Sequence, residues 1–343
     1  MPGEDLPAFD VYGCRVLSPA NDVDLARALH DAFGYFSTRL ANERDAEIDF
    51  EITSDELPVK PYRGQTWGLG LQLSAPSEQV TIRYNPGVPP YVVAGWTDFL
   101  LHWPDRRRVH ASGVTIEERA LVFAGARRSG KTDLALGLLG RGGCLLGDDW
   151  VFVGDDGRAY PYPHKVRIMD HHLARSHELS RTCFGGRATI TRAWMRARLR
   201  LRSFGRFVPH RLARYWFDAA LGKPVLEVDV THLGARPATP APLQTVFWLD
   251  RGDHPRLAIE SLSMTEMVQR LHHNYQYERG DYYRWVDLQA SLGALVPPGW
   301  MRADEVRAMG WLSDSLSEAS TFRVRIPTRA SSEELADLVL AQL

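Results

Sequence analysis

The N-terminal part of the chain alternates apolar and polar residues in short segments that are bounded by Pro, Gly or Ser. A period of two is typical of strands that bury one face, and we expect these strands to pair antiparallel. Residues 21–36 instead space their apolar residues as a helix does, after an Asn-Asp start. We therefore predict a small α+β domain over residues 1–95. Its predicted strands are 11–20, 47–54, 66–75 and 78–85.

After residue 95 the predicted strands and helices alternate, which is typical of an α/β fold. A connecting helix over 89–103 leads into strands at 108–116 and 120–124, and a further helix begins near Lys131. We therefore predict a second, α/β domain over residues 96–343. Its later predicted elements are strands at 243–250, 256–263 and 321–328 and helices at 263–278 and 331–343.

Composition excludes several classes of protein. The 343 residues are 44% hydrophobic and 24% charged with a formal net charge of −1, which gives no overall attraction to nucleic acid or anionic membrane. The three cysteines show no CxxC spacing, which argues against a zinc site or a disulfide framework. The N-terminus lacks a basic segment followed by an apolar core, and no apolar window approaches the roughly 18 residues of a membrane span. We expect a cytoplasmic protein without a membrane partner.

Residues 125–132 match the pattern GxxxxGK[ST] between a predicted strand and a predicted helix. Backbone N–H groups of such a loop wrap phosphate, which requires small residues at Gly125 and Gly130. Lys131 would reach the β- and γ-phosphates, and the Thr132 hydroxyl would coordinate Mg²⁺. The alternative is a glycine-rich turn that caps an ordinary helix. We expect a site for ATP and Mg²⁺ formed by Gly125, Ala126, Arg127, Arg128, Ser129, Gly130, Lys131, Thr132 and Asp133.

Asp148 and Asp149 follow a predicted strand, near the edge where a parallel sheet presents ligands. Successive side chains of an extended chain point in opposite directions, so one carboxylate can face Mg²⁺ while the other accepts a proton from a hydroxyl. The alternative is an Asp-Asp turn with solvated side chains. His110, which stands 21 residues before Lys131, is on its own more typical of a structural histidine.

The spacing of these residues resembles the HPr kinase/phosphorylase family and its relatives, in which a histidine precedes the phosphate loop and an Asp-Asp pair follows it. Here "VHAS" supplies His110, and "GDDW" places Asp148 17 residues after Lys131. The segments "VHASGV", "YPYPHKVRI" and "LSMTEMVQRL" are closer to the HPr-kinase-like proteins of lasso-peptide and related natural-product clusters, which phosphorylate a peptide hydroxyl. The family's glycine-rich signature after the Asp pair is replaced by "HKVRIMDHH", which disfavours HPr as the substrate and the reverse phosphorylase reaction.

The resemblance implies a fold related to phosphoenolpyruvate carboxykinase and a role for each matching residue. Asp148 would be the catalytic base, and His110 would orient or tune a carboxylate. Asp149 would assist through Mg²⁺ together with Thr132, although the two aspartates can exchange roles. Lys165 and Arg167, which closely follow the Asp pair, are candidate cations that would stabilise charge on the transferred group. A salt bridge is the alternative role for both.

Residues 165–214 carry thirteen Lys and Arg against two Asp and Glu. Arginine predominates, and Trp194, Met195 and Phe204 are interleaved with it, so this segment can attract anions and stack on planar groups. A solvated helix face is the alternative. We expect an anionic peptide or small-molecule acceptor, with nucleic acid as a less favoured partner. The acidic segment 42–56 could attract the basic segment across a domain or a subunit boundary. With the family resemblance, the second alternative is consistent with a homo-oligomer.

These features predict a kinase, a phosphotransferase that moves the γ-phosphoryl group of ATP to a Ser/Thr-type hydroxyl of a peptide or small metabolite. One alternative is a P-loop ATPase in which Asp148 and Asp149 only hold Mg²⁺. The other is a nucleotide-gated binding module whose segment 165–214 grips an anionic partner.

Overall fold

The computed structural model describes residues 8–11, 14–17, 22–33, 48–54, 71–74, 79–84, 90, 93–94, 97, 106–162, 165–175, 177–205, 225–291 and 300–343. The chain divides into two compact units. Unit 1 comprises Met1–Arg107 with Tyr275–Gly310, and unit 2 comprises Arg108–Asn274 with Trp311–Leu343. Tyr275–Gly310, which lies late in the chain, therefore belongs to the same compact unit as the N-terminal segment. The domain boundary predicted after residue 95 stays a prediction.

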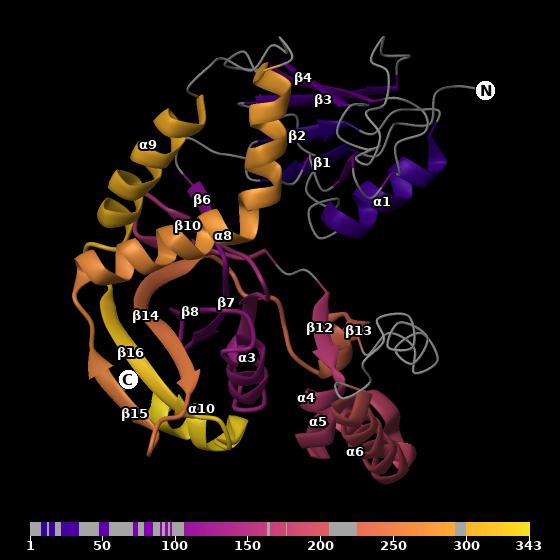
Figure 1. The fold of residues 1–343 in the computed structure, drawn as a ribbon, viewed down its shortest axis with the longest axis vertical. Helices are drawn as coiled ribbons and strands as arrows, with labels where there is room; N and C mark the ends of the chain where they lie inside the picture. Colours follow the sequence, from indigo (N-terminus) through magenta and orange to yellow (C-terminus); the bar gives the residue numbers. More distant parts are fainter. Residues whose placement is uncertain are drawn as a thin grey trace. The chain divides into compact units, whose positions relative to one another are not determined.

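Unit 1 contains a five-stranded sheet, within the described residues, in the order β1-β2-β3-β5-β4 (Figure 1). Helix α1 (Val23–Phe33) buries Leu25, Leu29 and Phe33, at the helical spacing that the sequence predicts. The ring of Phe33 packs against Phe9, with the centroids 6.1 Å apart. The strands are β1 (Ala8–Val11), β2 (Cys14–Leu17), β3 (Ile48–Ser54), β4 (Leu71–Ser74) and β5 (Gln79–Tyr84).

The prediction that these strands are all antiparallel is wrong. β3 pairs in parallel with both β2 and β5, while β1–β2 and β4–β5 are antiparallel. Because α1 lies between β2 and β3 along the chain, it forms the crossover that parallel strands require. The strand predicted over 11–20 is instead the hairpin of β1 and β2. Most of the predicted helix 89–103 lies outside the described residues.

Unit 2 is built around β14 (Ala241–Gly252), the longest strand of a nine-stranded mixed sheet in the described part of the chain. β14 pairs in parallel with β8 on one side and β16 on the other, whereas β7 is antiparallel to β8 and β9. The remaining strands of this sheet are β6 (Arg106–Val109), β7 (Ala111–Ile116), β8 (Arg119–Gly125), β9 (Cys144–Gly147), β10 (Val151–Gly154), β11 (Arg158–Tyr160), β15 (Ala258–Ser261) and β16 (Ser320–Pro327).

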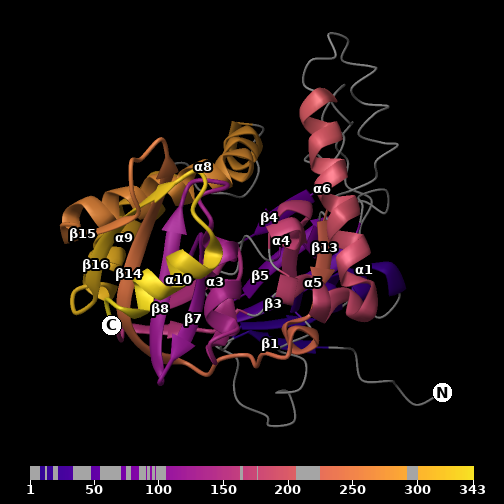
Figure 2. The same ribbon diagram turned by 90° about the horizontal axis from the view of Figure 1, so that it is seen from below.

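Helices cover both faces of this sheet, so unit 2 is α/β as predicted. In β8, Leu121 and Phe123 face a core shared with α3 (Lys131–Leu139) and α10 (Ser332–Leu340). Val122 and Ala124 face the opposite core, which includes Met267 and Leu271 of α8 (Met264–Ser291) and Leu312 of α9 (Trp300–Ser315). Figures 1 and 2 both show α10 beside α3, and the capping box of Ser331 and Glu334 fixes where α10 begins.

A segment of helices and short strands follows β11 along the chain. It packs on Leu145 of the sheet through Val166, Ile168 and Leu173. Among the described residues, no helix is both long and apolar enough to cross a membrane. The elements of this segment are β12 (Val166–Met169), β13 (Val225–Val228), α4 (Asp170–Arg175), α5 (His177–Phe184) and α6 (Ala188–Gly205), with 3-10 turns at Gly185–Arg187 and Val230–Leu233.

Candidate functional site

The predicted phosphate loop connects the end of β8 to the start of α3, and two glycines give it its shape. Gly125 and Gly130 have φ values of +153° and +101°, which side chains rarely allow. Gly130 occupies the N-cap position of α3, and no side chain caps the helix. The partial positive charge at this helix end is therefore left for a ligand, which is the arrangement that favours an anion.

The space around the loop is as restricted as its backbone. A Cβ atom on Gly125 would lie 2.6 Å from the carbonyl oxygen of Leu249 and 2.8 Å from Ser129 Oγ. Ser129 is 5% exposed, and its Oγ has no hydrogen-bond partner among the described residues. A buried hydroxyl without a partner is costly, so this atom fits a site that a polar ligand completes.

Arg251, near the end of β14, links the loop to the residues before α10 through hydrogen bonds. Its Nε donates to the carbonyl oxygen of Ser129 at 3.2 Å, and its Nη1 donates to that of Ala330 at 3.3 Å. A Cβ atom on Gly130 would lie 2.8 Å from Arg251 Nη2. Glycine is therefore favoured at position 130 by its backbone conformation, while the end of the flexible Arg251 side chain would have to shift to admit a Cβ atom.

Lys131 is buried, and its ammonium group lies on the loop. Nζ donates to the carbonyl oxygens of Gly125 at 2.8 Å and Ala126 at 3.4 Å. These bonds hold the ammonium group against the first residues of the loop that runs from Gly125 to Gly130. Arg127 and Arg128 are exposed, and Arg128 has a left-handed backbone with φ of 67°.

Asp148 joins the start of α3 to the sheet. Its Oδ1 accepts hydrogen bonds from Thr132 Oγ1 at 2.9 Å and from Ser112 Oγ at 2.6 Å. The side chain is only 4% exposed. Burial and the neighbouring charge of Asp149 raise the pKa of Asp148, and the bonds from Ser112 and Thr132 oppose that rise. The structure therefore brings together Thr132 and Asp148, which the sequence separates by sixteen positions.

Asp149 differs from Asp148 in its exposure to solvent and in its backbone conformation. Its side chain is 43% exposed, its φ is 70°, and its backbone oxygen accepts a bond from the N–H of Ala111 at 3.2 Å. Arg167 Nη1 lies 3.8 Å from Asp149 Oδ2, so this predicted cation does reach the aspartate pair. The charge of Lys165 instead acts on the carboxyl group of Asp229 and lowers its pKa, after the larger effect of hydrogen bonds from Thr231. β9, which precedes the pair, is antiparallel to β7 rather than part of a parallel edge.

His110 is buried between β6 and β7 and is held on two sides. Asn274 of α8 contacts its Nδ1 at 3.2 Å, and Trp150 packs on its ring with the centroids 5.3 Å apart. Burial and then the charge of Lys131 lower the pKa of His110 to about 4, while Asp149 acts in the opposite direction. His110 therefore lies within the electric field of both Lys131 and Asp149 and is neutral at physiological pH.

Asp133, predicted to bind the nucleotide, lies beside a pair of histidines. Ligand atoms of Asp133, His171 and His172 lie within 4.8 Å of one another, which is a spacing that a metal ion could use. However, the N–H of Met169 donates to His172 Nδ1 at 3.0 Å, so Nε2 carries the proton of the neutral ring. Nε2 faces Asp133 Oδ1 at 3.6 Å. The bond from Met169 disfavours a metal site at His172, because a metal at Nε2 needs the proton on Nδ1. At 3.6 Å, Asp133 and His172 form a close pair without a hydrogen bond.

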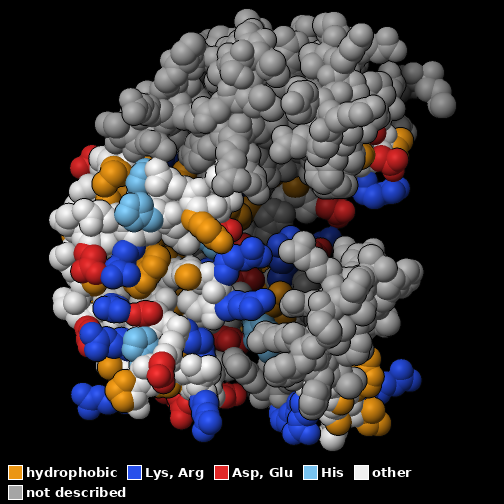
Figure 3. Space-filling model, viewed as in Figure 1, with side chains coloured by type: hydrophobic (Ala, Val, Ile, Leu, Met, Phe, Trp, Pro, Cys, Tyr) orange, Lys and Arg blue, Asp and Glu red, His pale blue; other side chains and the backbone are white. Residues whose placement is uncertain are grey.

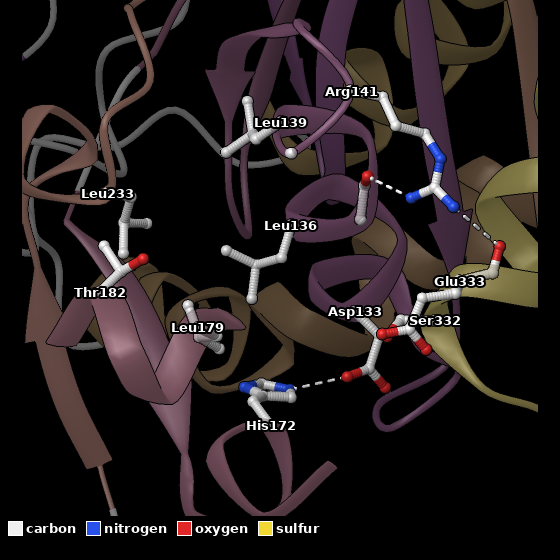
Figure 4. Close-up of a pocket in the computed structure, with 12 residues that line it drawn as sticks. Asp133, Leu136, Leu139, Arg141, His172, Leu179, Thr182, Leu233, Ser332 and Glu333 are labelled. Carbon is white, nitrogen blue, oxygen red and sulfur yellow. Dashed lines mark hydrogen bonds and ion pairs between the residues drawn. The ribbon is translucent and has the colours of Figure 1, made fainter. Parts of the chain in front are cut away.

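The Asp133–His172 pair closes one end of a hollow beside α3, shown in Figure 4. Leu136, Leu179 and Leu233 form apolar walls, and Arg141 lies at the other end, where it bonds to Asp337 of α10. The hollow runs along the helix rather than over the phosphate loop. It is therefore separate from the groups of Lys131 and Asp148.

The predicted basic surface is in part present on α6. Arg196 and Arg200 are exposed, and so are Ile190 and Trp194, at 76% and 52%. In Figure 3, basic and hydrophobic side chains lie next to one another where α4–α6 are seen in Figure 1. Residues 206–224, which hold the remaining arginines of the segment, lie outside the described residues.

Comparisons with known proteins add no assignment: no protein-family model matches this chain, and no curated protein matches it. The resemblance to the HPr kinase/phosphorylase family therefore stays a prediction based on motif spacing.

Three residues of this site were not expected from the sequence: Ser112, Arg251 and Asn274. Ser112 follows His110 by two positions, so the period of a strand could have placed both on one face. Asn274 and Arg251 gave no comparable signal, since each reaches the site from an element more than a hundred residues away.

Proposed function

We propose that the protein is an ATP- and Mg²⁺-dependent kinase, with a phosphate loop like that of HPr kinase, that transfers the γ-phosphoryl group to a hydroxyl of a peptide or small metabolite. The observation that carries the proposal is the hydrogen bond between Thr132 and Asp148 at the uncapped start of α3. It joins the residue that a Mg²⁺ ion would use to a buried carboxylate, at the N-terminal end of the helix that begins with Lys131.

The residues of the loop fit a nucleotide phosphate. Gly125 leaves no room for a Cβ atom against the backbone of Leu249. Ser129 Oγ has a hydrogen bond to make, and the ammonium group of Lys131 is already positioned on the loop. When bound, MgATP supplies the reactive phosphoryl group together with the charge neutralisation that its transfer requires. Arg167, beside Asp149, would add a second cation on the acceptor side.

The geometry favours an exchange of the roles expected for the two aspartates. Asp148 is buried, and its Oδ1 already accepts hydrogen bonds from the hydroxyl groups of Ser112 and Thr132. This supports a role for Asp148 in metal binding, because a carboxylate that accepts the hydrogen bond of Thr132 orients the hydroxyl that would contact the metal. Asp149 is accessible, and a base must reach the proton that it accepts. We therefore assign Asp148 to the metal and Asp149 to the acceptor hydroxyl.

Asp148→Asn and Asp149→Asn test both the function and this assignment. With labelled ATP and a pool of peptides and metabolites as acceptors, Asp149→Asn should bind MgATP normally and lose transfer by about 100-fold or more. Asp148→Asn should lose MgATP affinity as well as transfer. Asp155→Asn, the same change at an exposed carboxylate, is the control and should behave as wild type.

The opposite result, with MgATP binding lost only in Asp149→Asn, would restore Asp148 as the base. No transfer to any acceptor by the wild-type protein would contradict a kinase.

A P-loop ATPase is the second candidate, because the bond from Thr132 to Asp148 would serve Mg²⁺-dependent hydrolysis equally well. Turnover of ATP that does not increase with any acceptor would favour it. The exposed arginines and Trp194 of α6 support a third, non-enzymatic role as a nucleotide-gated binding module. Binding of nucleic acid with a steep salt dependence and no phosphate transfer would favour that role.

A further inference from the structure

Asn274 makes two contacts with His110 through a single atom. Its side-chain Nδ2 lies 3.1 Å from the backbone oxygen of His110 and 3.2 Å from the ring nitrogen Nδ1. A carbonyl oxygen can only accept a hydrogen bond, so the group that faces it must be the NH₂ end of the amide. The backbone contact therefore fixes which way the amide of Asn274 points.

The orientation of the amide in turn fixes the proton on the imidazole ring. The NH₂ group is a donor, so Nδ1 of His110 must accept, and in a neutral ring the proton then lies on Nε2. Burial and the charges of Lys131 and Arg127 lower the pKa of the ring to about 4, and the charge of Asp149 opposes this by a smaller amount. At neutral pH the ring is uncharged.

Trp150 keeps this ring in place. It packs on His110, and the guanidinium group of Arg108 lies over the indole at 5.1 Å from its centroid. The tryptophan follows Asp149 directly, so the same short segment carries the exposed carboxylate and the support for the imidazole. The orientation of the ring is therefore set by packing as well as by Asn274.

We propose that Asn274 is a positioning residue that holds His110 as the neutral Nε2–H tautomer, so that His110 donates a hydrogen bond to an anionic oxygen in the site. This inference rests on the proposed kinase function for the identity of that oxygen, a carboxylate or a phosphate. It excludes two other roles for His110. A ring with its proton on Nε2 cannot use that nitrogen to bind a metal or to accept a proton from a substrate.

NMR of ¹⁵N-histidine-labelled protein tests the tautomer without any activity measurement. In long-range ¹H–¹⁵N spectra at neutral pH, His110 should show an unprotonated Nδ1 and a protonated Nε2, with its signals identified by their loss in His110→Gln. Asn274→Asp replaces the donor with an acceptor and should move the proton to Nδ1 or give the imidazolium ion. Gln276→Glu, the same amide-to-acid change two positions further along α8, should leave the spectrum of His110 unchanged.

Transfer kinetics test what the tautomer does. Asn274→Asp should lower kcat by about 10- to 100-fold, the usual effect of losing a group that orients a functional histidine, with little change in KM for ATP. Asn274→Leu, which removes the donor without adding charge, should lower kcat in the same way and guards against a charge effect. Gln276→Glu should keep wild-type kinetics.

A proton on Nδ1 of wild-type His110, or an unchanged tautomer in Asn274→Asp, would overturn the proposal. So would wild-type kcat in both Asn274 variants. If the spectra match the expectation but the wild-type protein transfers no phosphate, the proposed function fails while the tautomer assignment holds.

Discussion

Asp148 is surrounded by groups that act on its pKa in opposite directions. Burial and Asp149 raise the pKa, and hydrogen bonds from Ser112, Thr132 and the backbone of Arg167 lower it, with a net rise. Since the folded pKa lies above the unfolded one, the folded protein binds the extra proton between the two values. Stability therefore falls as pH increases through that interval, because ionising the buried carboxyl group destabilises the fold.

Asp148→Asn should accordingly be more stable than wild type at neutral pH even though it is inactive. The amide removes the buried charge, while its oxygen can still accept from Ser112 and Thr132. We expect the melting temperature to rise by about 2–4 °C for each kcal/mol gained. Thermal unfolding followed by circular dichroism would measure this, and the gain should shrink at acidic pH, where wild-type Asp148 is protonated. A lower melting temperature than that of Asp155→Asn at neutral pH would contradict it.

At the scale of elements, the loop between β8 and α3 depends on Gly130 for its left-handed backbone, and a Cβ atom there would also displace the end of the Arg251 side chain. Gly142 has a similar φ, +90°, but a Cβ atom there would meet nothing within 4 Å. The two glycines therefore separate backbone strain from steric conflict.

Gly142→Ala should cost about 1–2 kcal/mol of unfolding free energy from backbone strain alone. Gly130→Ala should cost slightly more than this, because the end of the Arg251 side chain must also move, and should abolish MgATP binding. Urea unfolding and nucleotide titration of both variants would measure these effects. Equal destabilisation by the two substitutions would show that Arg251 yields without cost.

The order of strand, loop and helix around residues 119–139 was predictable because apolar periodicity and glycine chemistry act locally. The direction of the strands was not predictable, because alternation of apolar and polar residues indicates a buried face and does not identify the partner strand. The sequence also predicts only the first part of α8 and gives no signal for α9.

For the whole molecule, the described site residues all belong to unit 2, which is assembled from two separate stretches of chain. Added MgATP should therefore protect one unit from hydrogen exchange. Saturation at about 100 times Kd stabilises the state that binds by about 2.7 kcal/mol.

Hydrogen–deuterium exchange with and without MgATP would measure this protection by peptide. We expect slower exchange over residues 125–133 and 147–150, and no change over 8–17 and 48–54. Lys131→Ala should remove the effect. Equal protection in both units would show that the nucleotide acts on the chain as a whole.

The candidate residues of the site were easier to identify from the sequence than the residues that support them. His110, Lys131 and Asp148 came from a motif and its spacing, and the structure places them in one region of unit 2. Arg251 and Asn274 could not be foreseen, because their role depends on which distant elements pack together. The Asp133–His172 pair is of the same kind, since α4 brings the histidine to a residue expected to face the nucleotide.

Arg128 and Asp149 both hold a left-handed backbone without being glycine. In a randomised library selected for heat tolerance alone, glycine or asparagine should accumulate at both positions, because these residues adopt that conformation most easily. In a library selected for catalytic turnover, position 149 should remain acidic while position 128 drifts. Deep sequencing of the two pools would then distinguish the conformation that the backbone demands from the carboxylate that the reaction demands.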